Sequence, residues 1–221
     1  LGIPGAALTE LPSTEAVGVV LPEEGWAEDA LAMTERCKAL VVGPGLGRSP
    51  GTAGEVRRLV AGSKVPVVVD ADGLFALGEA PHIGEVVSTL PRDVILTPHD
   101  GEFARLAGSA PATDRIASTR ELSQVSKAIV LLKGPTTVVA DSAGDVLLGT
   151  SGSPRLATAG SGDVLSGIIG AFCARGVHGA FAAGLGAHVH GRAASLGSDE
   201  GLVAGDLPDL TRKFLSGERR N

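Results

Sequence analysis

The chain has 221 residues, a formal net charge of −6, 43% hydrophobic residues and 20% charged residues. This length allows one domain with a large core, and the composition is typical of a soluble globular protein rather than a disordered or membrane-spanning chain. The acidic balance argues against nucleic-acid binding, which usually uses a basic patch. No apolar run approaches the ~20 residues of a membrane helix, and no signal segment opens the chain, so we expect a cytoplasmic protein without membrane contact.

The two cysteines, Cys37 and Cys173, lie far apart in the sequence and have no CxxC or Cys/His spacing. We therefore expect buried free thiols rather than a disulfide or a metal site. The chain contains 32 glycines, one tryptophan and no tyrosine, which indicates many tight turns and close helix contacts.

Apolar strands and helical segments alternate over the first 134 residues. Strands are expected at 16–21, 39–43, 65–72, 93–99 and 128–134, and helices at 27–37, 53–62, 101–107 and 114–127. Continuous apolar strands separated by amphipathic helices indicate a parallel sheet covered on both faces.

The pattern changes after this point. Residues 136–149 predict two short strands joined by an Asp-Ser-Ala-Gly turn, which would form an antiparallel hairpin at one sheet edge. Helices are expected at 163–175, 179–196 and near 207–216, followed by a frayed polar tail. We find no linker or repeat, and interpret 1–221 as one domain.

Polar or glycine-rich groups follow four of the predicted strands. They are Gly43–Gly47, the pair Asp70 and Asp72, Thr97–Glu102, and Lys133–Gly134. Ligands of open parallel sheets bind beyond the carboxyl ends of the strands. We therefore expect these four groups to form one active-site edge.

Taken singly, each of these groups leaves alternatives open. "GPGLGRSPGT" lacks the ending of a P-loop and does not match GxGxxG, so a plain turn and a ligand-contacting loop are equally favoured. Asp70 and Asp72 could hold a metal or a hydroxyl, or one of them could cap the next helix. Lys133 could reach solvent, which is the commoner outcome, or an anion such as phosphate.

The segment from His99 to Glu102 also allows two interpretations. Glu102 could be a charge in the first turn of a helix, or could organise Mg²⁺ through water while His99 contacts substrate. We interpret His178, His188 and His190 as structural, because they have no ligand-like companions.

The stretch "RLATAGSGDVLSGIIGAFCARG" (155–176) combines a glycine turn with an apolar helical face that begins after Asp163. Backbone N–H groups of the turn Gly160-Ser161-Gly162 could stabilise a phosphoryl group during transfer. Asp163 could accept a proton from an attacking hydroxyl, or could simply cap the helix. Glycines on both sides of Ser161 favour the catalytic interpretation, because a cap alone needs no close backbone approach.

Residues 156–176 of this stretch resemble the glycine–aspartate signature of the ribokinase-like superfamily. "VVGPGLGRSPGT", "VVVDADGL", "ILTPHDGEFARL" and "LLKGPTTVV" are similar, in this order, to segments of the NAD(P)H-hydrate dehydratase family. The resemblance covers roughly residues 39–210 with five motifs. It implies a three-layer α/β/α sandwich with a mostly parallel sheet.

The resemblance also implies a hydro-lyase of metabolite repair. ADP in bacterial members, or ATP in eukaryotic ones, phosphorylates the hydroxyl of hydrated NADH or NADPH, and loss of phosphate regenerates the dihydronicotinamide. Mg²⁺ is the expected metal. Family members commonly form tetramers or other homo-oligomers, and some are fused to the epimerase for the hydrate.

Carried over by motif, the resemblance implies a role for each of the following residues. Asp163 would be the catalytic base, and Gly160, Ser161 and Gly162 the anion hole. Glu102 would reach the metal through water. The nucleotide would be bound by Lys133, Gly134, Pro135, Thr136, Thr137, Ser153, Leu156, Ala157, Thr158 and Gly162. The substrate would be bound by Gly45, Gly47, Asp72, His99 and Asp163.

Two positions depart from the family pattern: Phe75 stands where asparagine is usual, and Asp100 where proline is usual. The first strand–helix unit of the family is not recognisable before Ala16, so we expect a truncated chain or a piece of a two-domain protein. The competing interpretations are a vitamin-precursor kinase of the same fold and an inactive nucleotide-binding protein. "TPH" in place of "TPN" and the "GPGLG" loop argue against the kinase.

Overall fold

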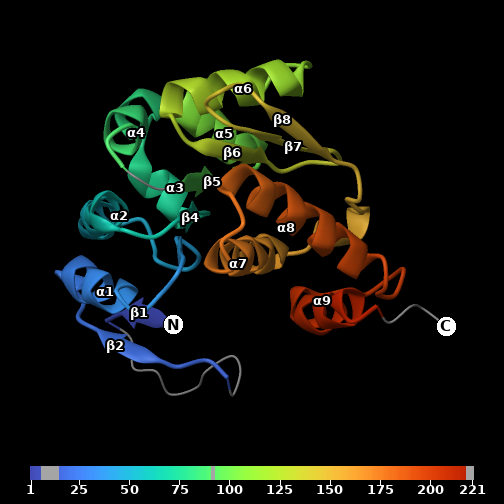
Figure 1. The fold of residues 1–221 in the computed structure, drawn as a ribbon, viewed down its shortest axis with the longest axis horizontal. Helices are drawn as coiled ribbons and strands as arrows, with labels where there is room; N and C mark the ends of the chain where they lie inside the picture. Colours follow the sequence, from blue (N-terminus) through green and yellow to red (C-terminus); the bar gives the residue numbers. More distant parts are fainter. Residues whose placement is uncertain (6–14, 91–92, 218–221) are drawn as a thin grey trace.

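The computed structural model describes residues 1–5, 15–90 and 93–217. Its centre is a six-stranded sheet whose strands lie in the order of the sequence (Figure 1). These strands are β3 (Leu40–Val42), β4 (Val67–Val69), β5 (Val94–Leu96), β6 (Ile129–Leu132), β7 (Thr137–Ala140) and β8 (Val146–Gly149). Strands β3 to β6 pair in parallel, whereas β7 and β8 form an antiparallel hairpin at the edge, as the sequence predicts.

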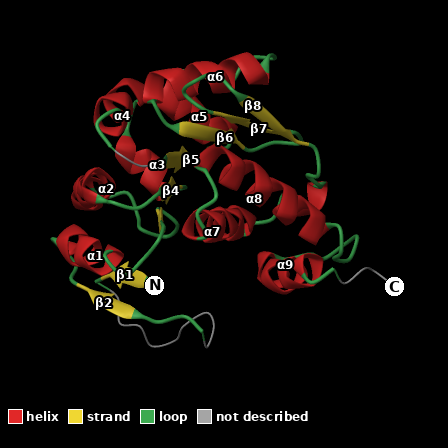
Figure 2. Ribbon diagram, in the orientation of Figure 1, coloured by secondary structure: helices red, strands yellow, loops and turns green. Residues whose placement is uncertain are grey.

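Helices cover both faces of this sheet (Figure 2). Because neighbouring parallel strands are consecutive, their right-handed crossovers place the connecting helices on one face. These are α2 (Pro50–Gly62), α3 (Asp72–Leu77), α4 (Ala80–Val87), α5 (Asp100–Ala107) and α6 (Arg115–Ser126), with α1 (Trp26–Thr34) against α2. The other face carries α7 (Ser161–Ala174) and α8 (Gly179–Ala194), and α9 (Leu207–Leu215) packs on α8. The expected three-layer α/β/α sandwich is confirmed.

Side chains of the strands belong to two separate hydrophobic cores, one on each face of the sheet. Along β4, Val67 and Val69 belong to the core beneath α2–α6, and Val68 belongs to the core beneath α7 and α8. Alternate residues of a strand point to opposite faces, so a strand buried on both sides must be apolar throughout. This explains why the short runs in the sequence were sufficient to predict these strands.

The expected strand at 16–21 is wrong in its length and its place. Only Val19–Leu21 (β2) is a strand, and it pairs in parallel with β1 (Gly2–Pro4) in a separate small sheet. Val19 and Leu21 pack on the core, whereas Val20 is 74% exposed. This alternation belongs to a strand buried on one face only.

Helix boundaries also differ from expectation. The helix expected at 27–37 ends at Thr34, and the one expected at 53–62 starts at Pro50, because Ser49 accepts a hydrogen bond from the Thr52 N–H and caps it. Helices α3 and α4 were not predicted. Cys173 is buried and free as expected, but the expectation that Cys37 is buried is wrong, because it follows the end of α1 and is exposed.

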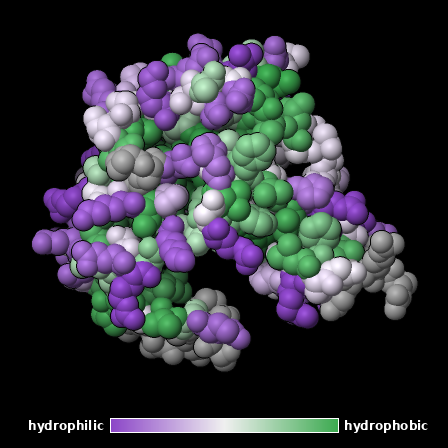
Figure 3. Space-filling view, in the orientation of Figure 1, coloured by the Kyte–Doolittle hydropathy of each residue, from purple (hydrophilic) through white to green (hydrophobic). Residues whose placement is uncertain are grey.

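None of the helices in the described part of the chain is long and apolar enough to cross a membrane. In Figure 3 the molecule is hollowed between the unit formed by α1, β1 and β2 and the helix α9. The expected fraying of the tail lies in residues 218–221, outside the described residues.

Candidate active site

A buried ion pair joins the ends of two parallel strands. The Asp70 carboxylate follows β4 and is almost fully buried, and its Oδ1 accepts a hydrogen bond from Nζ of Lys133, after β6, at 2.9 Å. Asp70 Oδ2 accepts from the Ser166 hydroxyl at 2.8 Å. Lys133 is therefore not the freely solvated side chain that the sequence favoured, because the cost of burying its charge is offset by a carboxylate. Asp70 Oδ1 also accepts from the N–H of Ala71, the residue that precedes α3, but no side chain caps that helix, and the carboxylate mainly holds this lysine.

The first turn of α7 lies directly against this pair. Gly160 is the N-cap, in a left-handed conformation (φ 84°), and no side chain caps the helix. A Cβ atom on Gly162 would lie 3.4 Å from Lys133 Nζ and 3.6 Å from Asp70 Oδ2. The N–H groups of a first helical turn have no partners within the helix and carry the positive end of its dipole. Together with Lys133 they form a site suited to an anion.

Asp163 lies in this first turn and is exposed. Its side chain makes no capping hydrogen bond, so the interpretation of Asp163 as a helix cap is wrong. Partial burial raises the pKa of the Asp163 carboxyl, the charge of Asp70 raises it further, and the charge of Lys133 opposes both. The structure thus places a carboxylate with raised proton affinity beside an anion site.

The two segments expected to bind the nucleotide run beside each other. Lys133 to Thr136 form the turn between β6 and β7, and Thr137 begins β7. A Cβ atom on Gly152 would lie 2.9 Å from the Pro135 carbonyl oxygen, so the segment that contains Ser153, Leu156, Ala157 and Thr158 passes close to this turn before it enters α7. Ser161 donates its hydroxyl proton to the Leu156 carbonyl at 2.6 Å and closes this segment onto the helix.

The glycine loop after β3 is held by Asp72. Gly43, Gly45 and Gly47 all have positive φ angles, which favour glycine. Asp72 Oδ2 accepts from the Gly47 N–H at 2.9 Å, and Oδ1 accepts from Arg48 Nε at 2.7 Å. Asp72 therefore does not cap α3 but fixes the loop. Side chains at Gly45 or Gly47 would meet no atom within 4 Å, so both face open space.

His99 and Glu102 form a capping box at the start of α5. His99 Nδ1 accepts from the Gly101 and Glu102 N–H groups, and Glu102 Oε2 accepts from the His99 N–H at 2.8 Å. Glu102 Oε2 also lies 3.6 Å from Lys133 Nζ. Within the described ranges, no group of three or more His, Cys, Asp or Glu side chains could hold a metal ion. Glu102 thus stabilises the helix start, and its role toward Mg²⁺ stays a prediction.

A cavity of about 190 Å³ opens beside the capping box. It is lined by Arg48, Ala71, Leu74, Phe75, His99, Gly101, Glu102 and Arg105. Sequence reasoning missed the two arginines of this cavity, as well as Ser166 on Asp70. Arg48 could have been found as the first charge after the glycine loop, but nothing in the sequence pattern distinguishes Arg105 or Ser166.

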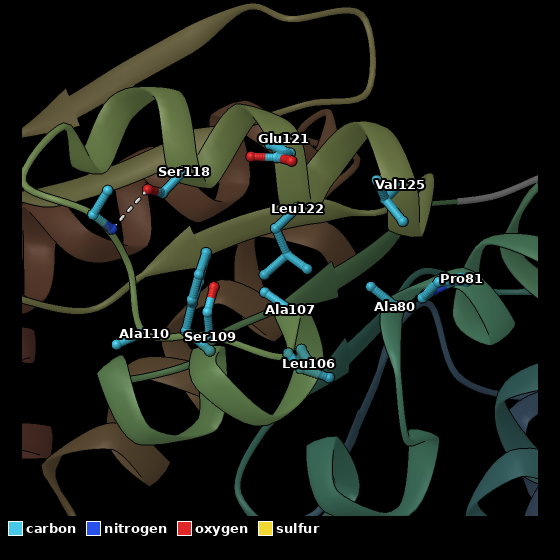
Figure 4. Close-up of a pocket in the computed structure, with 12 residues that line it drawn as sticks. Ala80, Pro81, Leu106, Ala107, Ser109, Ala110, Ser118, Glu121, Leu122 and Val125 are labelled. Atoms are coloured by element: carbon cyan, nitrogen blue, oxygen red, sulfur yellow. Dashed lines mark hydrogen bonds between the residues drawn. The ribbon is translucent and has the colours of Figure 1, made fainter.

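Another cavity, of about 250 Å³, lies between α4, α5 and α6 (Figure 4). Leu106, Leu122 and Val125 line it, and the Ser118 hydroxyl oxygen accepts a hydrogen bond from the Ala112 N–H at 3.0 Å. Glu121 is the single ionisable group in its lining, so this cavity has no set of groups suited to catalysis.

In its fold, this α/β/α sandwich is ribokinase-like. A ribokinase-like superfamily protein from Enterococcus faecalis has this fold, with a TM-score of 0.70 at 20% identity over 92% of this chain and 71% of that chain. An ADP/ATP-dependent NAD(P)H-hydrate dehydratase from Bacillus subtilis, co-crystallized with ATP/Mg²⁺, gives a TM-score of 0.74 at 30% identity over 91% of this chain and 72% of that chain.

Proteins related in sequence show the family within this class. The chain is 45% identical over 205 residues to the bifunctional NAD(P)H-hydrate repair enzyme Nnr of Salinibacter ruber, and covers 38% of its length with 88% of its own. It is 39% identical over 193 residues to an ADP-dependent (S)-NAD(P)H-hydrate dehydratase of Neisseria meningitidis, covering 65% of that protein with 83% of its own length. The NAD(P)H-hydrate dehydratase family model matches residues 7–215, and the chain belongs to this family. The resemblance stated from the motifs is confirmed.

Proposed function

We propose that this chain catalyses the nucleotide-dependent dehydration of NAD(P)H-hydrate to NAD(P)H through a phosphorylated intermediate. The observation that carries the proposal is the position of Asp163 in the first turn of α7, against the Lys133–Asp70 pair. A reaction in which a hydroxyl attacks a phosphoryl group needs a base and an anion site together. The names of the relatives from Neisseria and Bacillus support the choice of substrate.

In the proposed mechanism Asp163 accepts the proton of the hydrate hydroxyl as the hydroxyl oxygen attacks the terminal phosphorus of the nucleotide, and the nucleotide leaves shortened by one phosphate. The N–H groups around Gly160, Ser161 and Gly162 and the Lys133 ammonium stabilise the charge on the transferred phosphoryl group. The ring carbon–oxygen bond then breaks and phosphate leaves with the electron pair, while the neighbouring ring carbon loses a proton to water, so that the double bond of the dihydronicotinamide forms again. The raised pKa of Asp163 suits a base, because it increases the affinity of the carboxylate for the proton.

ADP or ATP would lie along the turn from Lys133 to Thr137 and the segment from Ser153 to Thr158. Mg²⁺ usually keeps several waters and takes one or two carboxylates plus substrate phosphates, so it does not need a cage of protein ligands. Glu102, whose Oε2 lies 3.6 Å from Lys133 Nζ, would contact the ion through water. When bound, Mg²⁺ neutralises charge on the phosphates.

The test is the recovery of absorbance at the dihydronicotinamide band when hydrated NADH is mixed with the protein, Mg²⁺ and either ADP or ATP. We expect recovery with at least one nucleotide and none with Asp163→Asn. No recovery with either nucleotide would overturn the proposal. Phosphorylation of a thiazole alcohol would favour the vitamin-precursor kinase instead, and nucleotide binding without turnover would favour an inactive binding protein.

The assembly around the chain is part of the proposal. The chain spans 38% of the bifunctional relative from Salinibacter, so an epimerase domain, fused or separate, is the proposed companion. We also propose one folded domain, a homo-oligomer and a cytoplasmic location. Phe181 and Leu185 on α8 and Leu148 on β8 are all exposed, and they support self-association through a hydrophobic area over α8 (Figure 3).

A further inference from the structure

An arginine on α5 lies over an aromatic ring on α3. The guanidinium carbon of Arg105 is 3.7 Å from the centre of the Phe75 ring, and that of Arg48 is 5.1 Å from the same centre. All three side chains line the 190 Å³ cavity beside His99 and Glu102. We infer that this cavity is a phosphate subsite for the hydrated dinucleotide, with Arg105 as its anchoring residue. The inference rests on the proposed function and names which part of the substrate binds here.

The charges around the cavity favour an anionic ligand. Arg48 is neutralised by Asp72 at 2.7 Å. Arg105 is exposed and, among residues 1–5, 15–90 and 93–217, makes no ion pair with a carboxylate. A guanidinium that lies over a ring keeps its N–H edge available, and this edge matches two oxygens of a phosphate. Arg105 is therefore a cation held in place without a charge partner.

The cavity lies next to the proposed transfer centre. Glu102 lines the cavity and its Oε2 is 3.6 Å from Lys133 Nζ, which in turn lies against Gly162. A substrate whose hydroxyl meets Asp163 can thus extend toward Arg105. At about 190 Å³ the cavity is smaller than the 300–1,000 Å³ typical of drug-sized ligands, so it takes one group of the dinucleotide and not the whole molecule.

Phe75 is a positioning residue in this arrangement. The electron-rich face of a phenyl ring attracts a cation within about 6 Å of its centre, and Arg105 meets this condition more closely than Arg48. The ring restricts the guanidinium before a ligand arrives, so less side-chain entropy is lost on binding. Asparagine at position 75 would offer no such face.

The experiment compares dissociation constants of wild type and Arg105→Gln for three reduced nucleotides, NADPH, NADH and reduced nicotinamide mononucleotide, and for ADP, by isothermal titration calorimetry without turnover. Loss of one charge-assisted contact should weaken binding about tenfold or more. Weakening of all three indicates the phosphate of the nicotinamide half. Weakening of both dinucleotides alone indicates the second phosphate of the bridge, and weakening of NADPH alone indicates the 2′-phosphate.

Arg58→Gln is the matched control, because Arg58 is exposed on a helix as Arg105 is, but lies on α2 and does not line the cavity. It should bind all three nucleotides as wild type does. Unchanged binding of all three by Arg105→Gln, or weakened binding of ADP alone, would overturn the subsite while leaving the proposed function intact. Failure of the wild-type chain to bind any of the three would also overturn the subsite, whereas the proposed function is decided separately by the recovery of dihydronicotinamide absorbance.

The part played by Phe75 has its own test. Phe75→Leu keeps an apolar side chain but removes the ring, and should weaken binding of the affected nucleotide less than Arg105→Gln does. The double variant should bind as Arg105→Gln alone, because the ring acts through the guanidinium. Additive losses in the double variant would show that Phe75 contacts the ligand independently and would overturn its positioning role.

Discussion

Asp163 is the residue whose surroundings determine most about the proposed chemistry. It lies in the first turn of α7 but caps nothing, so its side chain is available to a ligand. We predict that Asp163→Asn reduces turnover by at least about 100-fold, because the base is lost. The free energy of unfolding should change by less than about 1 kcal/mol, since the lost attraction between the charge and the helix N-terminus is offset by the lost repulsion from Asp70. Turnover and urea unfolding measured on the same preparation check both. Full activity in the variant, or a loss explained by unfolding, would contradict the catalytic role.

A second prediction at the scale of single residues concerns Asp70. Partial burial and the charge of Asp70 raise the pKa of Asp163, and a base works only when unprotonated, so activity should fall as the pH drops through this raised value. Asp70→Asn removes one of the two causes and should shift the acidic limb of kcat/KM to lower pH. Ser166→Ala is the control, because it removes a hydrogen bond from Asp70 but keeps the charge. An acidic limb that moves equally in both variants would contradict the electrostatic explanation.

These residues also show what sequence can and cannot predict at a site. Asp163 and Lys133 were predicted because a glycine turn and a strand end are visible as local patterns. The hydrogen bond between Ser166 and Asp70 joins residues 96 positions apart. A serine inside a helix carries no local signal of such a partner, so this contact required the structure.

At the scale of elements, the start of α5 has the capping box that the structure shows, and we predict that Glu102 has a second role toward Mg²⁺. Glu102→Gln can keep the capping box, because glutamine also accepts the N-cap hydrogen bond. We predict that this variant unfolds at nearly the wild-type urea concentration, while the Mg²⁺ concentration needed for half-maximal activity rises about tenfold. Titration of activity with Mg²⁺ checks this. Unchanged Mg²⁺ dependence would leave Glu102 as a structural residue alone.

His99→Ala is the complementary variant of the same helix start. It removes the acceptor of the Gly101 and Glu102 N–H groups and should cost about 1 kcal/mol of stability. Because the charge of Glu102 remains, the Mg²⁺ dependence should stay as in wild type. Urea unfolding and the same Mg²⁺ titration separate the two residues, and a rise in the Mg²⁺ requirement with His99→Ala would contradict this separation.

The elements that sequence predicted well are those buried on both faces. Strands β3 to β6 stand out as continuous apolar runs, and the hairpin stands out by its turn. α3 was missed because its six residues show fewer than two turns of a periodic pattern, and α4 because its eight residues include Pro81 and Gly84, which are poor helix formers. β2 was misplaced because an apolar run does not say which sheet it joins.

At the scale of the whole molecule, topology brings the site together. Parallel pairing from β3 to β6 places four strand ends at one edge, and this could be predicted from the alternation of strands and helices. The packing of α7 and α8 on the opposite face could not, because it depends on contacts between residues distant in the sequence. One such contact, between His190 on α8 and Ser161 at the start of α7, leads to a prediction about the stability of the fold in acid.

His190 on α8 is 5% exposed, and its Nε2 has no hydrogen-bond partner within the described part of the chain. Burial lowers the pKa of His190 to about 4, although a backbone hydrogen bond with Ser161 opposes the shift. An unfolded histidine takes up its proton near pH 6.5, so between about pH 6.5 and 4 the unfolded chain binds more protons than the folded one. Stability should therefore be complete above this window and fall as the pH drops through it, with His190 accounting for at most about 3 kcal/mol.

His190→Gln should remove this part of the acid sensitivity, whatever its stability at pH 7.5, because glutamine does not titrate. The measurement is the difference in free energy of unfolding by urea between pH 7.5 and pH 4.5, which should be smaller in the variant than in wild type. His82→Gln, which changes an exposed histidine on α4, is the matched control and should retain the wild-type difference. A buried neutral histidine must be released to solvent before it can take up its proton, and this is why His190 should couple unfolding to pH. An equal difference in His190→Gln and wild type would contradict this and would mean that other groups cause the loss of stability in acid.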